Sequence, residues 1–166
     1  MALRTGLLIL PSLGPERLAD LAAKAEELGY DDFWLADERF FREVYACLAL
    51  CAVRTHRIRL GPCVTDPYSR HPALTAMAMA TLDGISNQRA VLGLGAGVSG
   101  FRELGLDTSR SAVAIREAVE LIRRLLAGET VTVEGRAVNF NEGRLDFTPP
   151  RADWINKTDD YLRHGR

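Results

Sequence analysis

Two acidic residues and an arginine follow one another at Asp37, Glu38 and Arg39, directly after an apolar segment at residues 33–36. Carboxylates at the end of a buried strand can hydrogen-bond a ligand or transfer a proton. The same residues can also form a solvated cluster of ion pairs with Arg42, and their chemistry alone favours this second interpretation. Their position marks a candidate site without assigning its reaction.

A glycine-rich segment at residues 95–100, GAGVSG, formally matches the dinucleotide-binding pattern GxGxxG. That pattern needs a helix that begins in the loop and, after a second strand, an acidic residue about 20 positions further on. Here the next helical pattern begins only near Thr108, and Glu117 and Glu120 lie inside it. A Rossmann site is therefore rejected. The glycines either let a flat ring or a substrate approach the backbone closely or simply form a tight turn.

Other catalytic constellations are not indicated. His71 precedes Pro72, where it either caps a helix or transfers a proton, and capping is the safer interpretation. The three cysteines, Cys47, Cys51 and Cys63, are odd in number and form no CxxC pair, so we expect a reducing cytoplasm and no metal site. Cys47 and Cys51, four apart on one helical face, are expected to be small buried thiols. We find no Ser/His/Asp triad or Walker motif, so hydrolase and kinase functions have no support.

The elements that must position these residues form four successive strand-then-helix units. Short apolar runs predict strands at residues 7–10, 33–36, 58–64 and 90–94. Apolar residues at spacings of three and four predict helices at 15–28, 44–54, 72–85 and from about 110 to 127, the last capped by Thr108 or Ser109. Strands alternating with helices in this way pair in parallel through right-handed crossovers, which predicts an α/β fold.

The pattern changes after Gly128. Residues 131–133 and 137–140 flank Glu134-Gly135 as in a small β-hairpin. From Thr148 the chain is broken by two prolines and then becomes polar without an apolar period. We therefore expect one domain at residues 1–147 and an irregular tail at 148–166.

Composition narrows the class of partner. The formal net charge of −1 and the pI near 6.3 give no basic surface for nucleic acid or for an anionic membrane. No run of about 18 apolar residues exists for a membrane span. The sequence predicts a soluble cytoplasmic protein.

Four stretches together carry a family resemblance. They are Asp37 with FREVY at residues 41–45, LGPCVTDPYSRHP at 60–72, LDGIS at 82–86, and RAVLGLGAG at 89–97. In order and spacing they resemble the luciferase-like monooxygenase superfamily, and most of all its coenzyme F420-dependent branch, typified by methylenetetrahydromethanopterin reductase. The likeness extends from about Leu3 to about Phe147.

This resemblance implies a TIM (β/α)₈ barrel whose deazaflavin or flavin ring lies at the C-terminal mouth and exchanges hydride with a substrate. The expected cofactor is F420, with FMN as the alternative for a monooxygenase. The resemblance implies a non-prolyl cis peptide at Cys63-Val64. The expected cofactor contacts are Asp37, Cys63, Val64, Thr65, Asp66, Gly95, Ala96 and Gly97. Glu38 stands where relatives carry a functional histidine, so it is the candidate acid/base residue, and Asp66 replaces the usual asparagine.

Only half of such a barrel fits into this chain. A closed eight-stranded barrel typically needs about 250 residues, and the sequence has 166. Four parallel strands would leave two unpaired edges and an uncovered apolar face, which proteins avoid. We therefore expect a half-barrel that forms a homodimer or higher oligomer and so completes the barrel. The alternative from another class is a non-catalytic, truncated half-barrel that folds by self-association.

Overall fold

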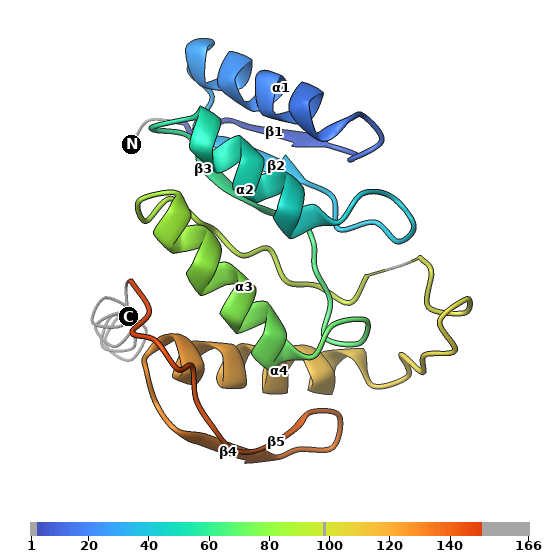
Figure 1. The fold of residues 1–166 in the computed structure, drawn as a ribbon. Helices are drawn as coiled ribbons and strands as arrows, with labels where there is room; N and C mark the ends of the chain where they lie inside the picture. The colour runs from blue at the N-terminus through green and yellow to red at the C-terminus, as the bar shows by residue number, and fades with distance from the viewer. Residues whose placement is uncertain (1–2, 98, 151–166) are drawn as a thin grey trace.

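The computed structural model describes residues 3–97 and 99–150. Figure 1 shows strands and helices alternating along the N-terminal part of the chain, followed by a long helix and a small antiparallel pair. The elements are β1 (Gly6–Ile9), α1 (Pro15–Glu27), β2 (Asp32–Leu35), α2 (Val44–Arg54), β3 (Arg59–Pro62), α3 (Pro72–Ile85), α4 (Ser111–Leu126), β4 (Val131–Glu134) and β5 (Asn139–Gly143). The sheet has the order β1-β2-β3 and is parallel throughout, which confirms the α/β class.

The fourth predicted strand, at residues 90–94, is not a regular strand. This segment follows β3 in parallel but makes only two isolated bridges, Leu60 with Ala90 and Thr65 with Leu94. Between them the amides of Val91 and Gly93 donate to the carbonyls of Leu60 and Pro62, at 2.9 and 3.1 Å. Pro62 has no N–H to return. The ladder is therefore interrupted, and β3 ends at Pro62, two residues earlier than predicted.

Local signals set the ends of three helices. A proline occupies the first position of α1 and of α3, and Gly29 follows α1 with φ +85°. Glu43 caps α2 by accepting a hydrogen bond from the amide of Ala46 at 2.7 Å. The predicted cap of α4 was wrong. Arg110 holds the capping position of that helix without a side-chain bond.

Ser109 takes part in a separate turn before α4. Its amide and hydroxyl both donate to the carboxylate of Asp107, at 2.9 and 3.0 Å. The serine side chain is therefore already engaged one residue before the capping position of the helix. A polar residue near a helix start caps it only when its oxygen reaches the amides of the first turn, and here a local acceptor competes for the hydroxyl.

Two apolar clusters form the core. The first lies between the sheet and helices α1, α2 and α3, and its largest fully buried members include Leu18, Phe33, Leu48 and Leu60. The second joins α4 to β4 and to the start of α3, through residues that include Ala76, Leu121, Leu125 and Val131. In Figure 1 each of the first three helices lies beside the next in chain order, along the sheet. The helices thus cover one face of the sheet.

The other face of the sheet is open. Along β1 the side chains alternate, with Leu7 and Ile9 packed against the first cluster and Leu8 exposed by 55%. Leu10, just beyond the strand, is 44% exposed. These apolar side chains lie on the side opposite the helices because successive residues of a strand point to opposite faces.

Arg89 fastens α2 to the segment that runs beside β3. Its buried guanidinium donates to the carbonyls of Ala52, Thr55, Ile58 and Ser86, at distances between 2.6 and 2.9 Å. Burial lowers the pKa of Arg89. The group occupies the C-terminal end of α2, where a helix favours a positive charge. It thereby fixes the distance between a covering helix and the sheet.

The pair β4–β5 is antiparallel and is held to the rest of the fold from two sides. Glu117 of α4 accepts hydrogen bonds from the amides of Arg136, Ala137 and Val138, at 2.9 to 3.0 Å. His71 accepts from the amide of Ala73 through Nδ1 and contacts the carbonyl of Asn139 through Nε2, at 3.2 and 2.9 Å. The capping interpretation of His71 is therefore confirmed.

The remaining expectations concern the cysteines, the tail and the membrane. Cys47 and Cys51 are buried free thiols, and no cluster of metal-ligating side chains occurs in the described part of the chain. Most of the predicted tail at 148–166 lies outside the described residues. Among helices of residues 3–97 and 99–150, none is both long and apolar enough to cross a membrane.

Candidate functional site

A cavity of about 150 Å³ lies beyond the C-terminal ends of β2 and β3. Three chain segments far apart in sequence line it, namely residues 36–39, residues 63–64, and Gly97 with Ser99. Five of the predicted site residues meet here: Asp37, Glu38, Cys63, Val64 and Gly97. In parallel α/β folds the reactive loops gather at this end of the strands. The predicted convergence of these loops is thus present in the structure.

The wall formed by residues 63–64 contains the backbone feature that the family resemblance implies. The peptide bond between Cys63 and Val64 is cis, which confirms that prediction. The Val64 side chain is 36% exposed and turns an apolar surface toward the cavity. One wall of the cavity is therefore apolar, while Asp37 and Glu38 supply carboxylates at its edge.

Glu38 and Ser99 meet across the cavity. The hydroxyl of Ser99 donates to Oε1 of Glu38, and both side chains are partly buried. Sequence reasoning missed Ser99 because it treated the glycine-rich segment only as a source of backbone freedom. Ser99 is the one polar side chain in GAGVSG, and this is the signal that could have identified it. The pair gives the cavity one carboxylate whose orientation is fixed by a neighbouring loop.

Arg39 is buried rather than part of a solvated cluster, so that interpretation was wrong. Its guanidinium pairs with the carboxylate of Asp66, and the two side chains are only 8% and 0% exposed. Nη1 also donates to the carbonyl of Asp37 at 2.6 Å, and the guanidinium lies 4.7 Å from the ring centroid of Phe101. A cation over an aromatic face is attracted by the ring quadrupole. Arg39 therefore links three loops around the cavity.

Arg42 also departs from the predicted ion-pair cluster. It extends toward the loop after β1, where its Nε donates to the carbonyl of Leu13. The backbone partner satisfies one guanidinium donor without a carboxylate. Arg42 therefore ties the loop after β2 to the loop after β1.

Asp66 lies behind the cavity wall instead of on it. Its carboxylate accepts from the amides of Tyr68 and Ser69 and from the hydroxyl of Ser69, each at 2.8 Å, in addition to its pairing with Arg39. With so many partners and no exposed surface, Asp66 organises the loop after β3. The structure thus places it as a support of the site.

Thr65 is also behind the wall, and it faces a buried tyrosine. Burial raises the pKa of Tyr45, and the Asp37 carboxylate raises it further, while the hydroxyls of Thr65 and Thr75 lower it. The ring of Tyr45 lies under the Arg70 guanidinium, 4.8 Å from it. Neither Tyr45 nor Thr75 was a predicted site residue, because nothing local in a helical pattern distinguishes a hydroxyl that faces a loop from one in the core.

The glycines at 95 and 100 are required by the close approach of protein side chains from other loops. A Cβ atom on Gly95 would lie 2.9 Å from Cγ2 of Val64, so a side chain there would displace the apolar wall. Gly100 has φ +72°, and its Cβ would lie 2.5 Å from Cβ of Arg39. Ala96 lies between these contacts and is partly exposed, outside the residues that line the cavity.

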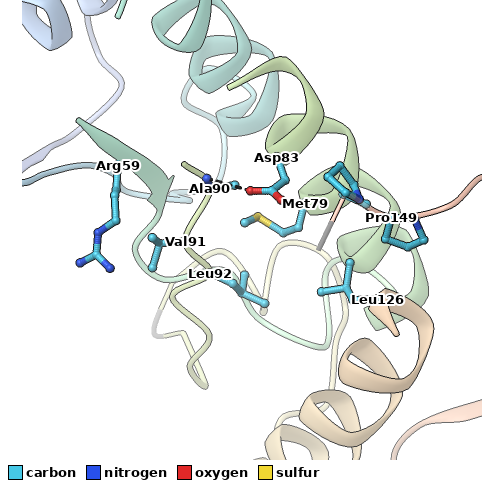
Figure 2. A pocket seen from close by; sticks show the side chains of 10 residues that line it. Arg59, Met79, Asp83, Ala90, Val91, Leu92, Leu126 and Pro149 are labelled. Carbon is cyan, nitrogen blue, oxygen red and sulfur yellow. Dashed lines mark hydrogen bonds between the residues drawn. The ribbon is translucent and has the colours of Figure 1, made fainter. Parts of the chain in front are cut away.

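A larger cavity, of about 270 Å³, lies near the start of β3 and beside residues 90–92. Figure 2 shows it between Val91 and Leu92 on one side and Met79, Leu126 and Pro149 on the other. Its acidic side chain, Asp83, is already hydrogen-bonded to the amide of Ala90 at 3.1 Å. This cavity is mainly apolar, so the smaller one is the better candidate for chemistry.

Comparison with known proteins shows the family of this chain. Residues 4–154 match the luciferase-like monooxygenase family model. The 5,10-methylenetetrahydromethanopterin reductase of Archaeoglobus fulgidus is 39% identical over 148 residues, which make up 89% of this chain and 45% of the reductase. The chain thus spans about half the length of this relative.

Two solved structures show the same arrangement. The coenzyme F420-dependent tetrahydromethanopterin reductase of Methanopyrus kandleri superposes with a TM-score of 0.85 at 34% identity, over 92% of this chain and 48% of that one. The monooxygenase RslO1 of Streptomyces bottropensis gives a TM-score of 0.78 at 30% identity, over 90% of this chain and 51% of that one. The described fold therefore corresponds to about half of each.

Proposed function

This chain belongs to the luciferase-like monooxygenase family, and we propose that it forms the N-terminal half of a (β/α)₈ barrel that uses reduced F420 for hydride transfer to a small molecule. The observation that carries this proposal is the cavity that unites Asp37, Glu38, Cys63, Val64 and Gly97 at the C-terminal ends of the strands. The reductase relatives, one of them named as coenzyme F420-dependent, favour F420 over FMN.

The residues present fit the ring end of such a cofactor. Val64 offers an apolar face. Because Gly95 has no side chain, the glycine-rich loop that begins there can lie against that face. The carboxylates of Asp37 and Glu38 can accept hydrogen bonds from ring N–H groups at the edge of the cavity. F420 supplies the hydride when it is bound. This chain supplies the wall on which the ring lies.

Glu38 is the proposed acid/base residue. Its carboxylate lines the cavity and is oriented by the hydroxyl of Ser99. A carboxyl group within hydrogen-bond reach of a reacting atom can hold or deliver a proton, which contributes about 10²- to 10⁴-fold to a rate. In this proposal Glu38 performs the proton transfer that accompanies hydride transfer.

The residues present do not fit the phosphate-bearing part of the cofactor. Among the described residues that line the cavity, Arg39 is the cation, and it is already engaged by Asp66, the Asp37 carbonyl and Phe101. A phosphate needs such groups free, or backbone amides at a helix start. We therefore propose that the phosphate contacts come from residues outside the lining of this cavity.

A second copy of this chain is the proposed partner. Leu8 and Leu10 expose apolar surface on the face of the sheet that the helices leave open. Two half-barrels related by a twofold axis would cover both open faces and pair both free edges. Light scattering should report a dimer or a higher oligomer at micromolar concentration. A stable monomer under those conditions contradicts this part of the proposal.

Cofactor titration tests the function. Purified protein is titrated with F420 and, separately, with FMN, and binding is followed by cofactor absorbance and fluorescence. Saturable binding of F420 supports the proposal, while binding of FMN alone favours the monooxygenase alternative, which the RslO1 relative supports. If the folded protein binds neither at high micromolar concentration, it is a non-catalytic half-barrel.

Turnover then tests Glu38. The protein with reduced F420 is given 5,10-methylenetetrahydromethanopterin, the substrate in the name of the Archaeoglobus fulgidus relative, and cofactor oxidation is followed by absorbance. We expect Glu38→Gln to lower the rate by about 10²-fold or more without weakening cofactor binding comparably. Glu120→Gln, at an exposed position of α4, is the matched control. An equal loss in both variants rules out the role of Glu38.

A further inference from the structure

Three buried hydroxyl groups gather behind the wall of the candidate cavity. Tyr45 comes from the first turn of α2, Thr65 from the segment after β3, and Thr75 from the first turn of α3. The three residues are 9%, 0% and 1% exposed. Within residues 3–97 and 99–150, none of the three hydroxyl oxygens has a partner with normal hydrogen-bond geometry. A buried hydroxyl without a partner destabilises a fold, so this cluster needs an explanation.

Two of these hydroxyls lie beside the third. The hydroxyls of Thr65 and Thr75 both lower the pKa of the Tyr45 phenol, while the carboxylate of Asp37, which lines the cavity, raises it. The Arg70 guanidinium lies over the Tyr45 ring and is itself paired with Glu43 at 2.7 Å. The cluster is therefore a small polar site whose walls are fixed.

We propose that this cluster binds one water molecule, and that the resulting network makes Tyr45 a positioning residue for the cavity wall. A buried water typically makes about three hydrogen bonds to polar groups that otherwise lack partners. Three hydroxyls supply three donors and a larger number of lone pairs. One water among them can accept from one hydroxyl and donate to the other two, which satisfies all three oxygens.

Thr65 is the point through which this network acts on the cavity. It directly follows Val64, whose side chain lines the cavity. Its amide donates to the carbonyl of Gly93 at 3.0 Å, and its carbonyl accepts from the amide of Gly95 at 2.9 Å. The backbone of Thr65 thus joins the apolar wall to the start of the glycine-rich loop. Hydrogen bonds to the Thr65 side chain would therefore hold the apolar wall and the glycine-rich loop in position relative to each other.

Unfolding measurements on threonine-to-valine variants test the water site without any cofactor. Thr75→Val keeps the shape of the side chain and removes only the hydroxyl. If the hydroxyl is part of a satisfied network, we expect the ratio of folded to unfolded protein to fall about fivefold. If the hydroxyl is unpartnered, the variant is as stable as the parent or more stable, and the proposal is overturned.

Two matched variants calibrate that result. Thr55→Val removes a buried hydroxyl that donates to the Cys51 carbonyl at 2.8 Å and accepts from Arg89 at 2.9 Å, so it must lose stability. Thr81→Val makes the same exchange at an exposed position of α3 and should change the stability little.

The double variant Tyr45→Phe with Thr75→Val tests whether the hydroxyls share one network. It should lose less stability than the sum of the losses in the two single variants. Additive losses rule out a shared network.

A second readout tests the role of Tyr45 in positioning and rests on the proposed function. We expect Tyr45→Phe to weaken F420 binding severalfold while Thr81→Val leaves it unchanged. Equal affinity in Tyr45→Phe and the parent overturns the positioning role. If the parent itself binds no cofactor but the stability coupling is present, the water site stands and the proposed function fails. Electron density for a water among the three hydroxyls in a crystal would identify the ligand, and a well-ordered cluster without one would rule it out.

Discussion

The guanidinium of Arg39 pairs with the carboxylate of Asp66, and the two side chains are buried almost completely. The pair joins the loop after β2 to the loop after β3, and Phe101 covers the guanidinium from the loop that follows the glycine-rich segment. Taking two charges out of water is costly, and removing one partner leaves the other uncompensated. The net attraction within the pair is therefore small. The pair keeps the rim of the cavity ordered mainly because separating the two residues would leave a buried charge without a partner.

Arg39→Ala should destabilise the protein by about 3 kcal/mol, which is the lower end of the cost of breaking a buried ion pair. The lower end applies because Asp66 keeps its bonds from Tyr68 and Ser69. Urea unfolding followed by circular dichroism measures the change. Arg102→Ala is the control, because that side chain is 93% exposed. A loss below about 1 kcal/mol would show that the pair behaves like a surface pair.

Glu117 makes the attachment of the β4–β5 pair dependent on pH. Hydrogen bonds from the amides of Ala137, Arg136 and Val138 lower the pKa of this carboxyl below its ordinary value of 4.5, in spite of burial. A lowered folded-state pKa gives stability that is fully present above the ordinary value and is lost as the pH falls through the folded value. The free energy of unfolding should therefore decrease as the pH falls below 4.5.

Glu117→Gln isolates this contribution. The amide lacks the charge that the three N–H groups favour, so the variant should be less stable at pH 7 and less sensitive to pH below 4.5. Unfolding midpoints measured between about pH 3 and about pH 7, which spans the range in which a carboxyl group titrates, give the comparison. Glu120→Gln serves as the exposed control on the same helix. Parallel pH profiles for Glu117→Gln and the parent would contradict the assignment.

The thiols should differ in reactivity. Burial raises the pKa of Cys51 to about 12 and also raises that of Cys47, so both stay protonated near neutral pH. Cys63 is partly exposed and lines the candidate cavity. A thiol reagent should therefore modify one cysteine in the native protein and the other two only after unfolding, as mass spectrometry of peptides can show. Bound cofactor should slow the reaction at Cys63, and an unchanged rate in its presence would place the cofactor elsewhere.

Gly95→Ala should weaken cofactor binding more than it weakens the fold. The added methyl group would lie 2.9 Å from Cγ2 of Val64, so the apolar wall or the glycine-rich loop must shift. Gly14→Ala is the control, because its Cβ would meet no atom within 4 Å and its φ of −61° suits alanine. Fluorescence titration should show at least about tenfold weaker binding for Gly95→Ala, which corresponds to about 1.4 kcal/mol. Equal affinities would mean that the ring does not lie on Val64.

The elements that the sequence predicted well are those with local signals. Pro15 and Pro72 mark helix starts at the positions observed, and Gly135 follows the last residue of β4, where the turn of the β4–β5 pair begins. The fourth strand was predicted as regular because its apolar run resembles the others. Its ladder depends on an N–H that Pro62, on the neighbouring strand, does not have. A defect in a partner strand cannot be read from the run itself.

In the site, too, the features with local sequence signals were predicted and the contacts between distant residues were not. Motif residues placed Asp37, Glu38 and the 63–64 wall together at one end of the sheet, as the structure has them. The partners of those residues were not foreseen: Ser99 for Glu38, Asp66 for Arg39, and Tyr45 and Thr75 behind Thr65. Each of these contacts joins residues from different loops or helices. Spacing along the chain carries information on periodicity but none on which side chains meet after folding.

Both apolar clusters of this fold lie on the helix side of the sheet or beyond it, against α4 and β4. The face that bears Leu8 and Leu10 belongs to neither. A unit built in this way keeps its packed core on one side of the sheet and an unburied apolar surface on the other. Substitutions on the open face can therefore change what covers that face without disturbing the core that holds the strands and helices together.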